Sequence, residues 1–116
     1  MHELTLIYGI ADAVQKVKEE NGLEHIEAVV VQVGELSGVL TEFLEEYYPL
    51  LTEDMPVLAG SELVIEKIPA IGRCNVCSEE YNIVANKGCC PSCGSMKKDV
   101  LSGKDFVMKE IRVLEE

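Results

Sequence analysis

The sequence is short of basic residues. It holds 10 Lys and Arg against 21 Asp and Glu among 116 residues, for a formal net charge of −11. Affinity for nucleic acids is built largely from contacts of Lys and Arg with the phosphate backbone. The acidic excess therefore argues against a nucleic-acid partner, and it suits a protein that handles cations or docks on a basic surface.

Long apolar runs are also missing. No segment approaches the roughly 20 apolar residues of a transmembrane helix, and residues 1–10 have no basic stretch of the kind that opens a signal peptide. We therefore expect a cytoplasmic protein with no membrane partner. Catalytic patterns are absent as well, since the chain has no glycine-rich phosphate-binding loop and no suggestive spacing of a nucleophile and a base. We do not expect an enzyme.

The spacing of apolar residues predicts two helices. The first covers residues 4–20 and ends at the turn signal Asn21-Gly22. The second begins at Thr41, which we expect to cap it. Pro49 should kink or restart this helix, because proline removes a backbone donor and clashes with the preceding turn. We expect the apolar stripe of the second helix to consist of Leu40, Leu44, Tyr47 and Leu51.

Three segments rich in β-branched residues, 26–33, 61–68 and 105–116, predict strands. The order of elements predicts an α+β fold, with a small three-stranded sheet and two helices on one face. An inserted zinc-ribbon-like domain with four cysteines interrupts this sheet before its last strand.

We expect the insert to cover residues 70–103, with residues 1–69 and 104–116 forming the α/β domain. The segment from about residue 70 to residue 98 is rich in Cys, Gly, Asn and Ser and poor in large aliphatic residues. Burial alone could not offset the conformational entropy that such a segment loses on folding. It therefore needs another source of stability.

Four cysteines form two C-x-x-C motifs, Cys74–Cys77 and Cys90–Cys93, with twelve residues between them. This spacing is typical of a closed, tetrahedral four-thiolate site, and it predicts structural zinc. A redox pair, an iron–sulfur cluster and a nucleic-acid-binding ribbon are the alternatives. The fifth cysteine, Cys89, is a spare thiol or exchanges with Cys90.

The chain begins Met-His-Glu. With Met1 retained, the terminal amine, the His2 amide nitrogen and the His2 imidazole can close two chelate rings around one metal ion. Deprotonating the amide requires a metal that favours in-plane nitrogen donors, which means nickel(II) or copper(II). Glu3 is better placed to cap or orient the first helix. Chemistry alone does not single out His2 as a ligand.

The context of these motifs is a resemblance to a known family. The chain contains, in order, MHEL, VGELSGV, SELVIEKIP before CNVC, CPSCGS and SGKDFVMKEIRV. Together they resemble the hydrogenase nickel-incorporation family HypA/HybF. Proteins of this family are nickel metallochaperones for [NiFe]-hydrogenase maturation, some of which also serve urease, and they work with a GTPase, HypB.

The resemblance implies that His2 is the nickel ligand, with the Met1 amine beside it and Glu3 as a neighbour. Residues 1–69 and 104–116 then form the nickel-binding domain. The resemblance also implies that nickel is transported and that zinc is structural. The zinc ligands implied are Cys74, Cys77, Cys90 and Cys93.

The partners implied are a HypB-type GTPase and a hydrogenase large-subunit precursor, with urease accessory proteins and a homodimer left open. No histidine lies in the zinc segment, and His25 is expected in a surface loop, so water, Glu3, a partner or a second subunit remains as the source of the fourth nickel ligand. The alternative function is a zinc-ribbon interaction module with no transported metal.

Overall fold

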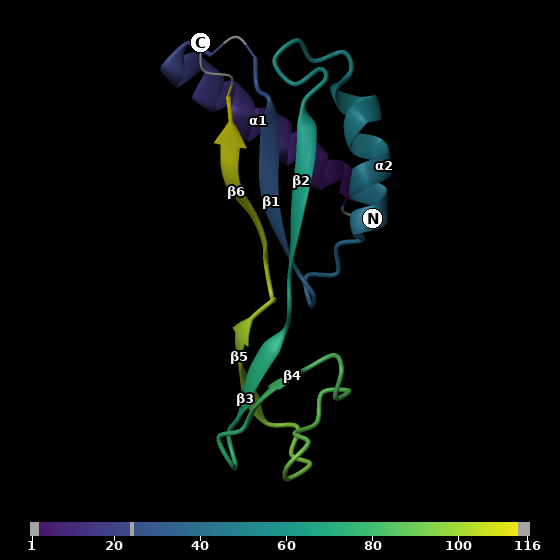
Figure 1. The fold of residues 1–116 in the computed structure, drawn as a ribbon, viewed down its shortest axis with the longest axis vertical. Coiled ribbons are helices and arrows are strands. Elements are labelled where there is room, and N and C mark those ends of the chain that lie inside the picture. The colour runs from purple at the N-terminus through teal and green to yellow at the C-terminus, as the bar shows by residue number, and fades with distance from the viewer. Residues whose placement is uncertain (1–2, 24, 114–116) are drawn as a thin grey trace. The chain divides into compact units, whose positions relative to one another are not determined.

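A computed structural model describes residues 3–23 and 25–113 of the chain (Figure 1). The elements are α1 (Glu3–Asn21), β1 (Ala28–Gly34), α2 (Thr41–Thr52), β2 (Glu62–Ile68), β3 (Ile71–Cys74), β4 (Glu80–Asn82), β5 (Lys98–Ser102) and β6 (Phe106–Arg112). They form two three-stranded sheets, ordered β2-β1-β6 and β4-β3-β5. The predicted α+β fold class is confirmed.

The first sheet has β1 at its centre. Backbone hydrogen bonds join Glu62 N to Glu27 O near one end of the β1–β2 pair, and Glu35 N to Ile68 O near the other. From the first hydrogen bond to the second, the residue numbers increase on both strands, so β1 and β2 run parallel. A parallel pair needs a long crossover connection, and α2 supplies it.

Two compact units make up the chain. The first, called here the helical unit, contains Met1–Val31, Val39–Glu66 and Val107–Glu116. The second, called here the cysteine unit, contains Gln32–Gly38 and Lys67–Phe106. The sequence-based boundaries after residues 69 and 103 remain a prediction of domain organisation.

The core of the helical unit lies between its helices and β1. Ile7, Ile10 and Val14 recur on one side of α1 and are buried. Val29 and Val31, on β1, are fully buried. Figure 1 shows α1 crossing one face of the sheet, with α2 beside it.

The buried face of α2 differs from the predicted stripe. Leu44 is buried as expected, but Tyr48 takes the place expected of Tyr47, and Leu40 is 49% exposed. The Tyr48 hydroxyl lies 2.7 Å from Ser61 Oγ, so the aromatic side chain is held by a hydrogen bond as well as by packing. The prediction was wrong because α2 carries apolar residues on two sides.

The ends of α2 also correct the sequence analysis. Leu40 occupies the N-cap position and makes no side-chain capping hydrogen bond, so Thr41 does not cap the helix. The helix continues through Pro49 to Thr52 and is not restarted there. The Thr52 hydroxyl donates to Tyr48 O at 2.7 Å in the last turn.

The second sheet was not predicted. Its strands are antiparallel, and Gly72 of β3 lies opposite Tyr81 of β4 and Val100 of β5. All three strands have at most five residues, and β5 is largely exposed. They therefore lack the run of alternating apolar residues on which a strand prediction depends.

The backbone is crowded within the cysteine unit where the chain leaves β5. A Cβ atom on Gly103 would lie 2.5 Å from Pro69 O and 2.6 Å from Ala70 Cα, and one on Gly34 would collide with the Gly103 carbonyl. Gly103 also has φ +81, in the left-handed region that side chains disfavour. Both glycines are required by this close approach.

Glu35 makes two hydrogen bonds next to this crowded backbone, one to a backbone group and one to a side chain. Its Oε1 accepts hydrogen bonds from Ala70 N at 2.9 Å and from Asn82 Nδ2 at 3.2 Å. Asn82 Oδ1 in turn accepts from Ala85 N at 2.8 Å. The VGELSGV segment thus holds the start of the second sheet through a carboxylate.

Replacing Gly103 with alanine should destabilise the chain by about 3 kcal/mol or more, because a left-handed backbone and a steric clash are combined. Gly38→Ala is the matched control, since Gly38 has φ +79 but open space around its Cβ position. It should cost only about 1 kcal/mol. Urea unfolding of the zinc-loaded proteins measures both values. Equal losses would contradict the crowding at Gly103.

Candidate metal centre

The two C-x-x-C motifs bring their four sulfur atoms together. The Sγ atoms of Cys74, Cys77, Cys90 and Cys93 all lie within 4.8 Å of one another. Cys74 Sγ is 3.5 Å from Cys93 Sγ, and Cys77 Sγ is 3.5 Å from Cys90 Sγ. Tetrahedral zinc with Zn–S bonds of about 2.3 Å places its sulfurs about 3.8 Å apart. The cluster therefore fits a structural, zinc-ribbon-like site.

The two motifs fold into matching knuckles. Ser78 N donates to Cys74 O at 3.0 Å, and Gly94 N donates to Cys90 O at 2.8 Å. Ser78 and Gly94, each directly after the second cysteine of its motif, have φ values of 67° and 77°. The left-handed turn points both sulfurs of a motif toward one place. A small residue directly after each C-x-x-C was the sequence signal for this repeat.

Backbone N–H groups also point at the first sulfur of each motif. Val76 N donates to Cys74 Sγ, and Ser92 N donates to Cys90 Sγ, both at 3.4 Å. The N–H groups of Cys77 and Val76 lower the pKa of Cys74 to about 6. Burial works against ionisation of Cys90, but backbone N–H donors lower its pKa overall. Both first thiols are thus prepared to be thiolates.

The second thiol of each motif is shifted the other way. The Glu79 N–H lowers the pKa of Cys77, but the Cys90 sulfur and burial raise it to about 12. For Cys93, a backbone N–H likewise lowers the pKa, while the Cys74 sulfur and burial raise it overall. Neighbouring thiolates repel one another, so the pKa values of the two thiols in each motif shift in opposite directions.

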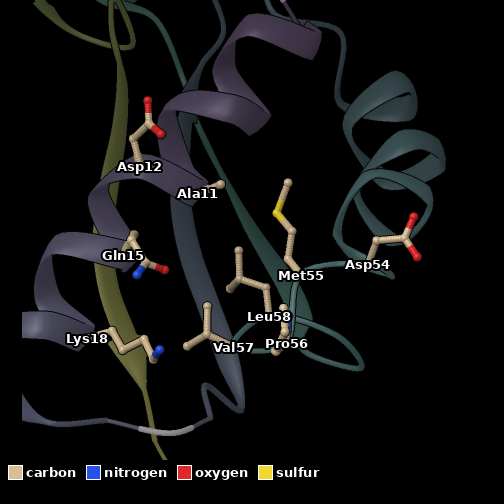
Figure 2. Close-up of a pocket in the computed structure, with 9 residues that line it drawn as sticks. All are labelled: Ala11, Asp12, Gln15, Lys18, Asp54, Met55, Pro56, Val57 and Leu58. Carbon is tan, nitrogen blue, oxygen red and sulfur yellow. The ribbon is translucent and has the colours of Figure 1, made fainter.

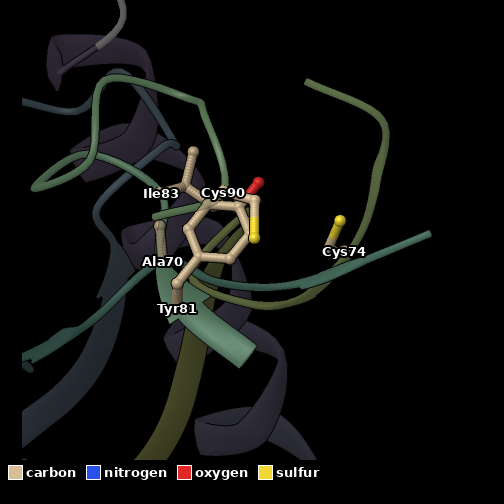
Figure 3. Packing of buried hydrophobic residues seen from close by; sticks show 5 residues of the cluster. All are labelled: Ala70, Cys74, Tyr81, Ile83 and Cys90. Carbon is tan, nitrogen blue, oxygen red and sulfur yellow. The ribbon is translucent and has the colours of Figure 1, made fainter. Parts of the chain in front are cut away.

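Little apolar surface surrounds the sulfurs. The buried cluster contains Ala70, Tyr81 and Ile83 besides two of the cysteines, and Figure 3 shows the Tyr81 ring beside Cys90. Tyr81 is 6% exposed, and its hydroxyl has no hydrogen-bond partner among the residues that the structure describes. Burial is the main cause that raises the pKa of this hydroxyl. A core this small leaves most of the stability to metal coordination.

Cys89 is not part of the sulfur group. It is half-buried, and its backbone N–H donates to Asn86 O at 3.0 Å. His25 is exposed. Met1 and His2, the residues predicted to chelate nickel, lie outside the described residues.

Glu3 is the described residue nearest the predicted nickel site in sequence. Its side chain is 3% exposed, and its Oε2 accepts a hydrogen bond from Leu40 N at 3.2 Å. Leu40 is the N-cap residue of α2, which has no capping hydrogen bond from its own side chain. The carboxylate therefore meets the positive end of α2 as well as lying in the first turn of α1. Sequence reasoning placed Glu3 at the first helix and missed its contact with the second.

An open pocket of about 490 Å³ lies in the helical unit, between α1 and the segment after α2 (Figure 2). Its lining residues are Ala11, Asp12, Gln15, Lys18, Asp54, Met55, Pro56, Val57 and Leu58. Figure 2 shows Asp12 and Asp54 on different walls. Within residues 3–23 and 25–113, the four cysteines form the one group of three or more candidate ligands that converges.

A helical α+β unit joined to a four-cysteine, zinc-ribbon-like unit defines a small metal-binding protein. Residues 1–113 match the sequence family described as "Hydrogenase/urease nickel incorporation, metallochaperone, hypA". The chain therefore belongs to the HypA family of nickel metallochaperones for hydrogenase maturation.

Relatives match over nearly their full length. The chain is 34% identical to hydrogenase maturation factor HypA of Geotalea uraniireducens over 113 residues, which is 97% of this chain and 99% of that protein. It is also 34% identical to hydrogenase maturation factor HybF of Klebsiella pneumoniae, covering 96% of this chain and 97% of that protein. The predicted family resemblance is confirmed.

Solved structures share the fold. The solution structure of the Ni metallochaperone HypA from Helicobacter pylori matches with a TM-score of 0.68 at 22% identity, over 100% of both chains. A second HypA solution structure matches with a TM-score of 0.72 at 23% identity, over 100% of this chain and 98% of that one.

Across the described part of the chain, no helix has the length and apolar character needed to span a membrane.

Ser78→Gly should stabilise the zinc-loaded protein by about 1 kcal/mol, because glycine relieves the left-handed backbone strain at this position. Gly94→Ser, at the matching position of the other knuckle, should cost a similar amount. Thermal unfolding at a fixed free-zinc concentration compares the two variants. A loss of stability in Ser78→Gly would show that the serine side chain contributes more than its backbone strain costs.

Zinc binding near pH 7.5 should release fewer than four protons, because N–H···S hydrogen bonds lower the pKa of Cys74 to about 6 and also lower that of Cys90. Calorimetry in two buffers of different ionisation enthalpy counts the protons. A release close to four would contradict the effect of the N–H···S hydrogen bonds on Cys74 and Cys90.

Proposed function

We propose that this chain binds Ni²⁺ at its amino terminus and delivers it for maturation of [NiFe]-hydrogenase. The observation that carries the proposal is the family match over residues 1–113, in a chain that begins Met-His-Glu. The nickel donors would be the Met1 amine, the His2 amide nitrogen and the His2 imidazole. These nitrogens suit the tetragonal or square-planar geometry of nickel(II).

Glu3 supports this proposal by its position. A buried carboxylate held by Leu40 N fixes the chain at the residue directly after His2. We propose that Glu3 tunes nickel affinity or partner contact through this anchorage and does not need to ligate the metal. The fourth corner of the nickel site would come from water, a partner or a second subunit, because the cysteine unit contains no histidine.

The two proposed metal sites would differ in how readily they exchange their metal ions. Zinc held by Cys74, Cys77, Cys90 and Cys93 has four thiolates and no open position, so it would stay bound. A terminus with three nitrogens keeps one corner free and can accept and surrender its metal. Protons compete at the amine and the imidazole, whose ordinary pKa values are about 7.7–8.0 and about 6.5, so mild acidification would favour release.

We further propose that the chain acts in the cytoplasm with a HypB-type GTPase and a hydrogenase large-subunit precursor, as a carrier and not as an enzyme. Urease accessory proteins and a second copy of the chain are further candidate partners, since the family description names urease beside hydrogenase. The alternative function is a zinc-ribbon interaction module, which the four-cysteine cluster alone would also support.

Nickel titration of the zinc-loaded chain tests the proposal. The native chain should bind about one Ni²⁺ with a square-planar absorption band, and two extra residues before Met1 should abolish binding, because they turn the Met1 amine into an amide and move the free amine away from His2. His2→Ala should also lose binding, whereas His25→Ala, the matched control, should keep it. Elemental analysis should give about one zinc per chain throughout.

Equal nickel uptake by the native and extended chains, or none by either, would overturn the amino-terminal site. The zinc-ribbon interaction module would then be the better description of the chain.

A further inference from the structure

A second apolar stripe runs along α2, apart from its buried face. Leu40, Phe43, Tyr47 and Leu50 follow one another at intervals of three, four and three residues, which places them on one side of the helix. Leu40 is 49% exposed and Leu50 is 58% exposed. This set is called the outer stripe below.

Two aromatic rings form the middle of the outer stripe. The rings of Phe43 and Tyr47 stack with their centroids 6.1 Å apart and an angle of 25° between their planes. Both side chains are half-buried, and so are not absorbed into the core as Leu44 and Tyr48 are. Stacked rings between two exposed leucines form a contiguous apolar surface on one helix, of the kind that marks protein interaction sites.

An acidic row lies alongside the outer stripe. Glu42 and Glu46 are exposed and one helical turn apart, and Glu53 continues in the same direction just beyond the helix. The sequence of α2, TEFLEEYYPLLT, contains no Lys, Arg or His to offset these charges. A surface with this charge attracts basic partners and repels acidic ones.

The outer stripe begins next to the amino-terminal region. Leu40, its first residue, is the one whose backbone N–H donates to Glu3 Oε2. A partner on the stripe would therefore sit close to the residue that follows the proposed nickel donors.

We propose that the outer stripe and its acidic row form the docking surface for a basic amphipathic helix of a partner protein. Leucine-like side chains of that helix would pack on Phe43 and Tyr47, while its Lys or Arg side chains would face Glu42 and Glu46. The idea that this surface serves nickel transfer rests on the proposed function. The idea that it binds a partner helix is argued from α2 alone.

Charge decides among the occupants. An anionic lipid surface would be repelled by the acidic row. A second copy of the chain, packed stripe to stripe, would bring together two helices that carry glutamates and no basic residue, which is unfavourable. A basic helix is the occupant that satisfies both the apolar and the charged part of the surface.

The test uses the full, zinc-loaded, ¹⁵N-labelled chain and a synthetic helical peptide of about 18 residues with Leu on one face and Lys on the other. Amide signals of α2 should shift on titration. Leu50→Lys should weaken binding by about tenfold, because it places a cation in the apolar contact. Val107→Lys makes the same change at an exposed valine of β6 and should stay within about twofold of the native affinity.

The acidic row is tested separately. Glu42→Gln together with Glu46→Gln should weaken peptide binding and reduce its dependence on salt, since two charge contacts are removed. The control is Glu19→Gln together with Glu20→Gln, which removes the same charge at exposed positions on α1. It should change peptide affinity and its salt dependence much less.

Four results would overturn the proposal. The first is no binding of the Lys peptide up to millimolar concentration, and the second is equal binding of a peptide with Glu in place of Lys. The third is a set of shifts confined to residues outside α2. The fourth is self-association of the peptide-free chain that Leu50→Lys abolishes, which would make a second copy the occupant.

Nickel titration of Leu50→Lys separates this surface from the proposed function. The variant should take up nickel like the native chain while binding the peptide about tenfold more weakly. A native chain that binds the peptide but no nickel would refute the amino-terminal carrier and leave the docking surface intact.

Discussion

Four cysteine sulfurs within 4.8 Å of one another impose the constraint on which the cysteine unit depends. Without a cation, each ionised sulfur raises the free energy of ionising the next, and burial adds to that cost. The opposite pKa shifts of Cys74 and Cys77, to about 6 and about 12, express this conflict within a single motif. A divalent metal removes it by stabilising all four thiolates at once.

The rest of the unit is arranged around that site. Cys74 is the last residue of β3 and lies opposite Lys98 of β5, so the register of the second sheet and the position of the first knuckle are set together. At the other end of the same strands, the crowded backbone at Gly103 and the carboxylate of Glu35 hold the chain. Because the apolar cluster is so small, loss of metal should loosen the sheet, and no large core remains to hold it.

Local patterns in the sequence predicted much of this. The two C-x-x-C motifs identified the four converging cysteines, since each knuckle is a short turn whose geometry follows from a few adjacent residues. The first helix and the strands of the first sheet were also predicted, with ends shifted by a few residues. In these elements the apolar spacing is strong and has a single interpretation.

Other features depended on contacts between distant residues and could not be read locally. The hydrogen bond from Leu40 N to Glu3 joins residues far apart in sequence. The buried face of α2 was misassigned because Tyr47 and Tyr48 are both apolar enough for a core, and only packing decides between them. The outer stripe is the pattern that misled the prediction. The helix has two apolar sides, and its own core buries only one of them.

The net charge of −11 is distributed unevenly between the two units, and this distribution affects which partners the charge favours. By sequence, the helical unit holds four basic and sixteen acidic residues, whereas the cysteine unit holds six basic and five acidic ones. The acidic excess that argued against nucleic acid therefore belongs to the helical unit alone, and the cysteine unit is close to neutral. Four thiolates around one zinc ion would add only two negative charges. Charge thus does not decide against a nucleic-acid-binding ribbon. What the charge does indicate is a preference for cations and basic partners at the helical unit, where α2 presents glutamates and no basic residue.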